Sequence, residues 1–183
     1  MIYVALLRGI NVGGKNKVSM KELKKSFERV GMEAVTTYIN SGNIIFETSN
    51  QNETEIIATL EEVIFEDFSL NIKVLLRTIK DLTAIIEALP SHWKNDKDMK
   101  SDVLFLGDEI NDEKVLNELV PKPDIDTVLY VPGAILWSVD RTNVTKSGLM
   151  RLASKDLYKK MTIRNVNSTR KIYLIMEEIM NNK

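Results

Sequence analysis

The chain of 183 residues contains no cysteine and only one histidine, His92. The absence of cysteine excludes disulfides, cysteine-bound metals and thiol nucleophiles. A single histidine excludes any metal site built on a histidine pair, and it leaves His92 as the one candidate for a histidine base. His92 lies in a polar segment, where a solvated loop residue is the simpler interpretation. The sequence therefore indicates no metal site and no cofactor, and it identifies no catalytic residue.

Long apolar runs are also missing. No stretch approaches the roughly 18 to 20 apolar residues that a membrane-spanning helix needs, and the N-terminus has no signal-peptide pattern. The composition is that of an ordinary globular protein, with 44% hydrophobic and 28% charged residues, which excludes collagen-like and disordered classes. We therefore expect a cytoplasmic protein without a membrane partner.

The charges balance overall but not locally. The 25 lysines and arginines nearly match the 26 acidic residues, for a net charge of −1. Residues 47–70 hold seven acids and no Lys or Arg, whereas residues 141–171 hold nine Lys or Arg and one acid. An asymmetry of this size either marks an anion-binding face, or the basic and acidic segments neutralise each other across the fold or simply solvate it.

The first 77 residues show alternating strand and helix patterns. A continuous apolar run, residues 1–7, is typical of a central strand that is buried on both faces. Ser19 and Glu22 form a capping box that predicts the start of a helix. Two short β-rich segments then meet at Asn40-Ser41-Gly42-Asn43, a hairpin turn. A helix and a strand follow at residues 52–68 and 72–76. The order is βαββαβ, the ferredoxin-like plan.

The second half repeats this order of elements. Residues 103–106 have the pattern of another buried strand, and Pro132-Gly133 turns a second hairpin. A helix is predicted at residues 146–161, before a short strand and a C-terminal helix. We therefore expect an α+β fold of two ferredoxin-like βαββαβ halves, each an antiparallel sheet with helices, plus a connecting helix and a C-terminal helix. The expected domains are the first half, the connecting helix with a polar linker, and the second half with its C-terminal helix, at residues 1–77, 78–101 and 102–183.

The ferredoxin-like strand order, 4-1-3-2, brings the end of the first strand beside the hairpin that joins the second and third strands. In the first half this places the loop of residues 8–17 next to the hairpin turn, about one strand spacing of 4.8 Å away. The loop contains no acid, and its glycines expose amides that can cradle an anion. The candidate ligand-binding residues at this edge are Arg8, Asn11, Gly13, Gly14, Lys15, Asn40, Ser41 and Asn43.

A second basic patch is expected at the opposite edge of the second sheet. Polar residues follow the third strand of that half and others end its fourth strand, with the first strand between them. The candidate ligand-binding residues here are Lys146, Arg164 and Asn165. Asn and Thr in both patches also have a purely structural interpretation, because such side chains often bond their own backbone.

Residues 9–16 fit the P-loop form G-x-x-x-x-G-K up to its last position. That position requires a Ser or Thr hydroxyl for magnesium, and Asn16 stands there. The predicted helix also starts near Ser19, whereas a P-loop helix starts at the Gly-Lys pair. We therefore do not interpret this segment as a nucleotide-hydrolysing P-loop.

Three polar motifs stand out: residues 3–17, Tyr-Val-Ala-Leu-Leu-Arg-Gly-Ile-Asn-Val-Gly-Gly-Lys-Asn-Lys; residues 37–43, Thr-Tyr-Ile-Asn-Ser-Gly-Asn; and residues 162–169, Thr-Ile-Arg-Asn-Val-Asn-Ser-Thr. With these motifs the chain resembles the bacterial domain-of-unknown-function 1697 family along its whole length. The resemblance implies a two-part α/β protein with ferredoxin-like halves, and it implies no activity, cofactor or catalytic residue. Val166 departs from the aromatic residue expected at its position.

We hypothesise that the protein binds an anionic ligand in a cleft between the halves: a nucleotide, a phosphorylated metabolite or a nucleic-acid backbone. Ligand sites favour such interfaces. The expected walls are Arg8, Asn11 and Asn40 on one side and Lys146, Arg164 and Asn165 on the other. Two alternatives stay open: an enzyme that acts on a phosphorylated substrate at the same site, and a protein–protein adaptor without a small ligand. The sequence indicates no oligomeric state.

Overall fold

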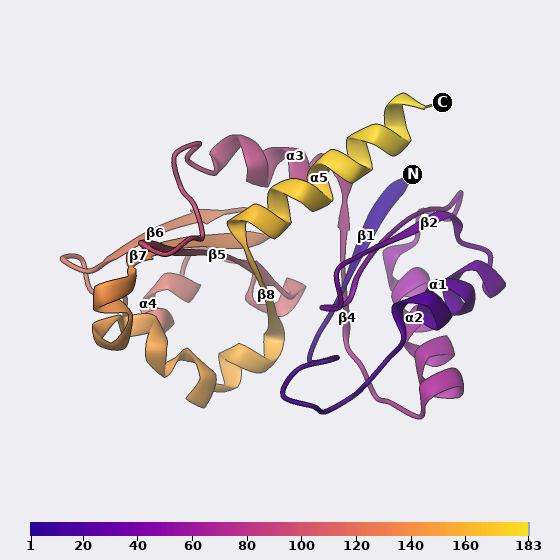
Figure 1. The fold of residues 1–183 in the computed structure, drawn as a ribbon, viewed down its shortest axis with the longest axis horizontal. Coiled ribbons are helices and arrows are strands. Elements are labelled where there is room, and N and C mark those ends of the chain that lie inside the picture. The colour runs from indigo at the N-terminus through magenta and orange to yellow at the C-terminus, as the bar shows by residue number, and fades with distance from the viewer. Residues whose placement is uncertain (183) are drawn as a thin grey trace. The chain divides into compact units, whose positions relative to one another are not determined.

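A computed structural model describes residues 1–182 as two four-stranded antiparallel sheets with helices (Figure 1). The first sheet has the strand order β2-β3-β1-β4, and the second has the order β6-β7-β5-β8. Both are the predicted 4-1-3-2 order read from the other side, and every neighbouring pair is antiparallel. The expected α+β fold with two ferredoxin-like halves is confirmed.

The first sheet consists of β1 (Ile2–Leu7), β2 (Glu33–Tyr38), β3 (Asn43–Glu47) and β4 (Val74–Thr78). Helices α1 (Met20–Arg29) and α2 (Glu53–Phe68) cover one face of this sheet (Figure 1). The Ser19 side chain caps α1 by accepting from the Glu22 amide, as the capping box predicts. Asn52 caps α2 by the same kind of bond. The local sequence therefore sets where both helices begin.

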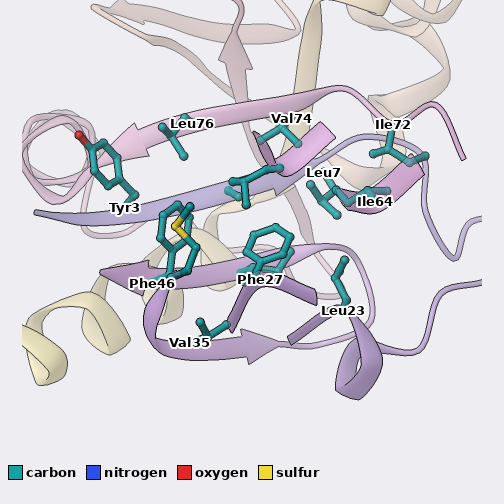
Figure 2. Packing of buried hydrophobic residues seen from close by; sticks show 14 of the residues in the cluster. Tyr3, Leu7, Leu23, Phe27, Val35, Phe46, Ile64, Ile72, Val74 and Leu76 are labelled. Carbon is teal, nitrogen blue, oxygen red and sulfur yellow. The ribbon is translucent and has the colours of Figure 1, made fainter. Parts of the chain in front are cut away.

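The core of the first sheet lies between its strands and these two helices. Tyr3 and Leu7 of β1 point into it together with Phe27 of α1 and Phe46 of β3 (Figure 2). The Tyr3 and Phe46 rings stack with their centroids 5.9 Å apart, and Phe27 meets Phe46 edge-on at the same distance. All six residues of β1 are buried, as expected for a central strand.

The second sheet consists of β5 (Met99–Leu106), β6 (Asp126–Val131), β7 (Ala134–Asp140) and β8 (Met161–Asn165). Three further helices are α3 (Ile79–Ala88), α4 (Val115–Leu119) and α5 (Val166–Asn181). Short 3-10 helices are η1 (Asp108–Ile110), η2 (Arg141–Lys146), η3 (Gly148–Ser154) and η4 (Asp156–Lys160). Residues of α4, η3 and η4 pack on one face of this sheet, around Leu104, Ile135 and Trp137 (Figure 1).

The predicted helix at residues 146–161 is wrong, because η2 ends at Lys146 and the 3-10 helices η3 and η4 occupy the rest of this region. Ser147 and Lys155 have extended backbones, with ψ of 143° and 147°, and each interrupts the helical turns. At the first break the Ser147 hydroxyl accepts from the Leu149 amide and donates to the buried Asp126 carboxylate. A tertiary hydrogen bond thus overrides the local helix pattern, and periodicity carries no sign of it.

Asp126 is a buried carboxylate that joins three segments of the second unit. Its Oδ1 accepts from Trp137 Nε1 at 3.0 Å and from Ser147 Oγ at 2.5 Å. Its Oδ2 accepts from the backbone amides of Lys122 and Gly148 at 2.8 and 2.9 Å. Burial by itself raises the pKa of this carboxyl, but the four donors outweigh burial and hold the pKa below its usual value. The charged carboxylate is therefore the stable form in the folded protein.

The chain forms two compact units. One contains Met1–Lys80 together with residues 172–182, and the other contains Asp81–Lys171. These bounds differ from the expected domains, because α3 falls almost wholly in the second unit and the C-terminal part of α5 in the first. A helix pattern shows that one face is apolar, but it does not show which sheet covers that face.

Within residues 1–182 no helix is long and apolar enough to cross a membrane. The same residues contain no group of three or more His, Asp or Glu side chains placed to hold a metal ion.

We predict that Asp126→Asn destabilises the protein by about 2–4 kcal/mol at pH 7. Whichever way the new side chain is turned, its NH2 group faces an N–H donor, either the Trp137 ring or the amides of Lys122 and Gly148. The folded-state pKa of Asp126 lies below its ordinary value of 3.8. The stabilisation is therefore present above that value and is lost as the pH falls through the folded-state pKa. Urea unfolding of both proteins at pH 7 and at about pH 3 measures the difference.

The control for this prediction is Asp124→Asn in the turn that precedes β6, where the side chain is exposed. We expect that variant to lie within about 0.5 kcal/mol of wild type. Equal stability of Asp126→Asn and wild type at pH 7 would contradict the structural role given to Asp126.

Candidate functional site

The glycine-rich loop after β1 forms a small hairpin. The Lys15 amide donates to the Val12 carbonyl at 3.0 Å. Gly13 and Gly14 turn the chain with φ of +57° and +76°, a pair of positive angles that is typical of a type I′ turn and that glycine adopts without strain. Residues 12–17 are all exposed, so the loop offers its backbone to solvent.

Asn11 fixes the base of this hairpin. Its side-chain carbonyl accepts from the Val18 amide at 2.8 Å, and its side-chain amide donates to the Val18 carbonyl at 3.0 Å and to the Asn40 carbonyl at 2.9 Å. The bond to Asn40 confirms that the loop lies beside the β2–β3 turn, as the strand order predicts. Because these bonds use the carbonyl and both amide hydrogens, Asn11 positions the loop.

The β2–β3 turn packs tightly on the end of β1. The Leu7 amide donates to the Gly42 carbonyl at 2.8 Å, and a Cβ on Gly42 would lie 2.7 Å from Leu7 Cβ. Gly42 has a φ of +76°, so both its space and its backbone require glycine. Asn43 is fully buried and donates to the Tyr38 carbonyl and to Ser41 Oγ. These two residues stabilise the turn that carries Asn40.

A groove of about 560 Å³ lies where the loop, the β2–β3 turn and the start of α1 meet. We call it the loop–helix groove, and its lining residues are Asn11, Gly14, Lys17, Val18, Ser19, Met20, Lys21 and Asn40. The lining contains two lysines and no acid. Within residues 1–182 the structure shows no backbone acceptor for the amides of Gly14 and Lys17. The groove is therefore a cationic surface with backbone donors.

The start of α1 adds to this character. The first amides of a helix have no acceptor within the helix, and the aligned peptide dipoles place about half a positive charge at that end. Ser19 Oγ accepts from the Glu22 amide at 3.4 Å, whereas Met20 and Lys21 line the groove. Lysine charge, a helix N-terminus and loop amides thus share one surface, which suits an anion.

The loop differs from a P-loop in its relation to the helix. α1 begins at Met20, five residues after Lys15. The loop between them is a hairpin, whereas a P-loop wraps phosphates at the first turn of its helix. The structure thus confirms that the segment is not a P-loop. Lys15 is exposed at the loop tip, and Arg8 is half-buried at the end of β1.

The three residues of the second patch lie in different environments. Lys146 is exposed at the end of η2. Arg164 of β8 is buried, its Nη1 donates to the Ile163 carbonyl at 2.9 Å, and burial lowers its pKa to about 10, so it stays charged at pH 7. The Asn165 side chain accepts from the Ser168 amide at 2.9 Å and so caps α5. This cap sets the start of α5 at Val166.

Neighbouring polar residues of this patch hold the linker that precedes β5. Arg141 Nη2 donates to Asn95 Oδ1 at 3.1 Å, and Asn167 Nδ2 donates to the Asn95 carbonyl at 2.8 Å. Arg170 donates to the Pro90 carbonyl at 2.8 Å. The polar side chains beside this patch therefore fix the linker within the second unit. Ligand binding by the second patch, and a cleft that it shares with the first, stay predictions.

Two lysines that line the groove, Lys17 and Lys21, are not among the candidate ligand-binding residues predicted from the sequence, although Lys17 belongs to the predicted loop of residues 8–17. The capping box at Ser19 marks the first turn of α1, so Lys21 could have been placed at the helix start. No sequence pattern predicts that Lys21 lies beside the loop, because this position depends on how Asn11 folds the hairpin back.

The family model described as protein of unknown function DUF1697 matches residues 1–137. The chain belongs to the DUF1697 family. The conserved bacterial protein SP0830 from Streptococcus pneumoniae, a solved structure, is similar to it with 29% identity and a TM-score of 0.82, over 96% of this chain and 98% of that protein. No curated protein matches this chain. The DUF1697 match includes every residue that lines the loop–helix groove.

Replacing Asn11 with Ala is expected to destabilise the protein by about 1 kcal/mol more than Asn16→Ala does. Both asparagines have left-handed backbones, with φ of 53° and 48°, so the backbone cost is shared and the difference reports the side-chain bonds. Asn16 contributes one bond, to the Gly9 carbonyl, whereas Asn11 contributes three. Urea unfolding of the two variants tests this, and equal losses would show that Asn11 does not fix the loop.

His92→Ala should change the free energy of unfolding by no more than about 0.5 kcal/mol. His92 is exposed, and the linker around it is held by Arg170, which the substitution leaves in place. Thermal denaturation measures the effect. A loss above 1–2 kcal/mol, on the order of a buried hydrogen bond, would contradict this placement.

Proposed function

We propose that this DUF1697 chain binds an anionic ligand through the loop–helix groove. The observation that carries the proposal is the lining of that groove, which combines two lysines, the N-terminus of α1 and open loop amides without any acid. A phosphate group suits such a surface, because it accepts several N–H bonds and is attracted by the helix dipole. The ligand classes that fit are a nucleotide, a phosphorylated metabolite and a nucleic-acid backbone.

The bonds around the groove give it a defined shape before any ligand arrives. Asn11 joins the loop to Val18 and Asn40, and Gly42 holds the turn against Leu7. Ordering a flexible loop on binding would reduce the net affinity, whereas a preformed loop avoids that cost. The rigid base of the loop therefore favours a binding role for the residues that it carries.

Further donors and charge on the same loop support contacts with a ligand larger than one phosphate. Lys15 and Gly13 are exposed at the loop tip, and Arg8 lies at the loop's start. Because lysines on an open surface attract anions through screened electrostatics, binding should weaken as salt rises. A nucleic-acid ligand would show a steep fall of affinity with salt, since several phosphate contacts release counterions together.

The test is binding of ATP, glucose 6-phosphate and a single-stranded oligonucleotide, measured by thermal shift and calorimetry. A ligand at 100 times its Kd adds about 2.7 kcal/mol of stability, which raises the Tm by several degrees. We expect at least one of these phosphates to bind. The double variant Lys17→Ala/Lys21→Ala should then weaken its affinity at least about tenfold, because it removes two charged donors.

The matched control is Lys24→Ala, which removes a lysine from the same helix outside the lining of the groove. We expect this variant to keep the wild-type affinity. Equal losses from Lys24→Ala and from the double variant would mean that general surface charge, and not the groove, attracts the anion. Absence of binding by all three phosphates at low salt would overturn the proposal.

A further inference from the structure

The second sheet has an open edge at β6. β6 is the outermost strand in the order β6-β7-β5-β8, and it pairs only with β7 within the described sheet. In antiparallel strands, the amides and carbonyls of alternate residues point to opposite sides of the strand. The Asp126 amide donates to the Lys122 carbonyl in the preceding turn and so points away from β7. By the same alternation, the backbone groups of Val128 and Tyr130 point to the open edge.

This edge lacks the features that normally prevent strands from pairing between molecules. Bulges, charged side chains and prolines protect edge strands. β2, at the edge of the first sheet, has a register shift between Glu33 and Thr36. β6 is paired without interruption from Asp126 to Val131, and its residues 127–131 contain no charge, proline or glycine. The two edges thus differ in protection.

The side chains of β6 also favour pairing with another strand. Leu129 is 40% exposed, and Thr127 is exposed on the same face of the strand. Val128 and Tyr130 are half-buried on the other face. β-branched and aromatic residues of this kind form the favourable cross-strand pairs of sheets.

We propose that β6 pairs with β6 of a second copy of the chain, antiparallel and centred on Leu129. A two-fold axis through this position makes the strand its own partner. Val128 of each copy lies opposite Tyr130 of the other, and these are the residues whose backbone groups face the edge. Both exchange N–H and C=O bonds there, which gives four bonds across the axis.

The side chains suit this register. The two copies of Leu129 meet at the axis as a pair without backbone hydrogen bonds, where side chains lie closest, and this contact covers their exposed surface. Thr127 lies opposite Val131, and Val128 opposite Tyr130. A two-fold axis brings a charged strand close to its own copy, so that like charges repel. Residues 127–131 carry no charge, and this repulsion is absent. This neutrality is the reason for committing to a second copy.

The pairing of two short strands is at the small end of protein interfaces, so we expect a weak and reversible dimer. Sedimentation velocity from about 1 µM to about 500 µM covers the range of such affinities. The wild-type chain should shift from monomer to dimer across this range. A chain that stays monomeric throughout, or that forms trimers or open-ended polymers, would overturn the proposal.

Leu129→Lys should abolish the dimer, because it places two ammonium groups at the axis. The matched control is Thr37→Lys on β2, which should dimerise as the wild type does. Far-UV circular dichroism checks that each variant is folded. Dimerisation of Leu129→Lys at the wild-type concentration would overturn the proposal.

A second pair of variants separates loss of pairing from loss of folding. Leu129→Lys and Leu129→Glu should each be monomeric alone, but an equimolar mixture should form dimers, because the opposite charges meet at the axis. Failure of the mixture to associate, while both variants are folded and the wild type dimerises, would locate the interface elsewhere. If the chain never self-associates but β6 binds an added extended peptide, the partner of β6 is a peptide and the proposal of a second copy is overturned.

Discussion

The close approach of the β2–β3 turn to the end of β1 is the constraint on which the candidate site depends. Gly42 leaves no room for a side chain against Leu7, and the Leu7 amide bonds its carbonyl. This contact fixes the turn at the sheet edge from which the glycine-rich loop leaves. Asn11 then bonds the loop to Asn40 and Val18, and the loop comes to lie beside the first turn of α1. The groove is a consequence of this sequence of contacts.

Similar polar residues have different roles in the two patches. In the second patch, Asn165 caps α5, and Arg141 and Asn167 hold the linker before β5. Their hydrogen bonds are made with side-chain and backbone groups of the same unit. In the first patch, Asn11 has the structural role, and it leaves the lysines and loop amides open. Whether a polar residue at a strand end has a structural role or is open to a ligand therefore depends on the hydrogen-bond partners of its side chain.

The sequence predicts the strands and the starts of α1 and α2, because these depend on local patterns. The βαββαβ order of the elements then predicts the strand order. The apolar run of β1 and the Ser19 cap are visible within a few residues. The 3-10 helices after β7 are not predicted, since Asp126 breaks the helix at Ser147 from a distance of 21 residues along the chain. The groove is predicted in part. Strand order places the loop beside the turn, but only the folded hairpin brings Lys17 and Lys21 to one surface.

The central claim is that the loop–helix groove binds a phosphate-bearing anion, and a titration of backbone amide resonances with ATP tests it most directly. The account predicts that the shifts concentrate on the amides of Gly14, Lys17, Met20 and Lys21, while the amides around Asp126 remain unchanged. The shifts should saturate with increasing ATP and weaken with added salt. Resonances of the groove that stay in place while others shift, or no shifts at all, would contradict the claim.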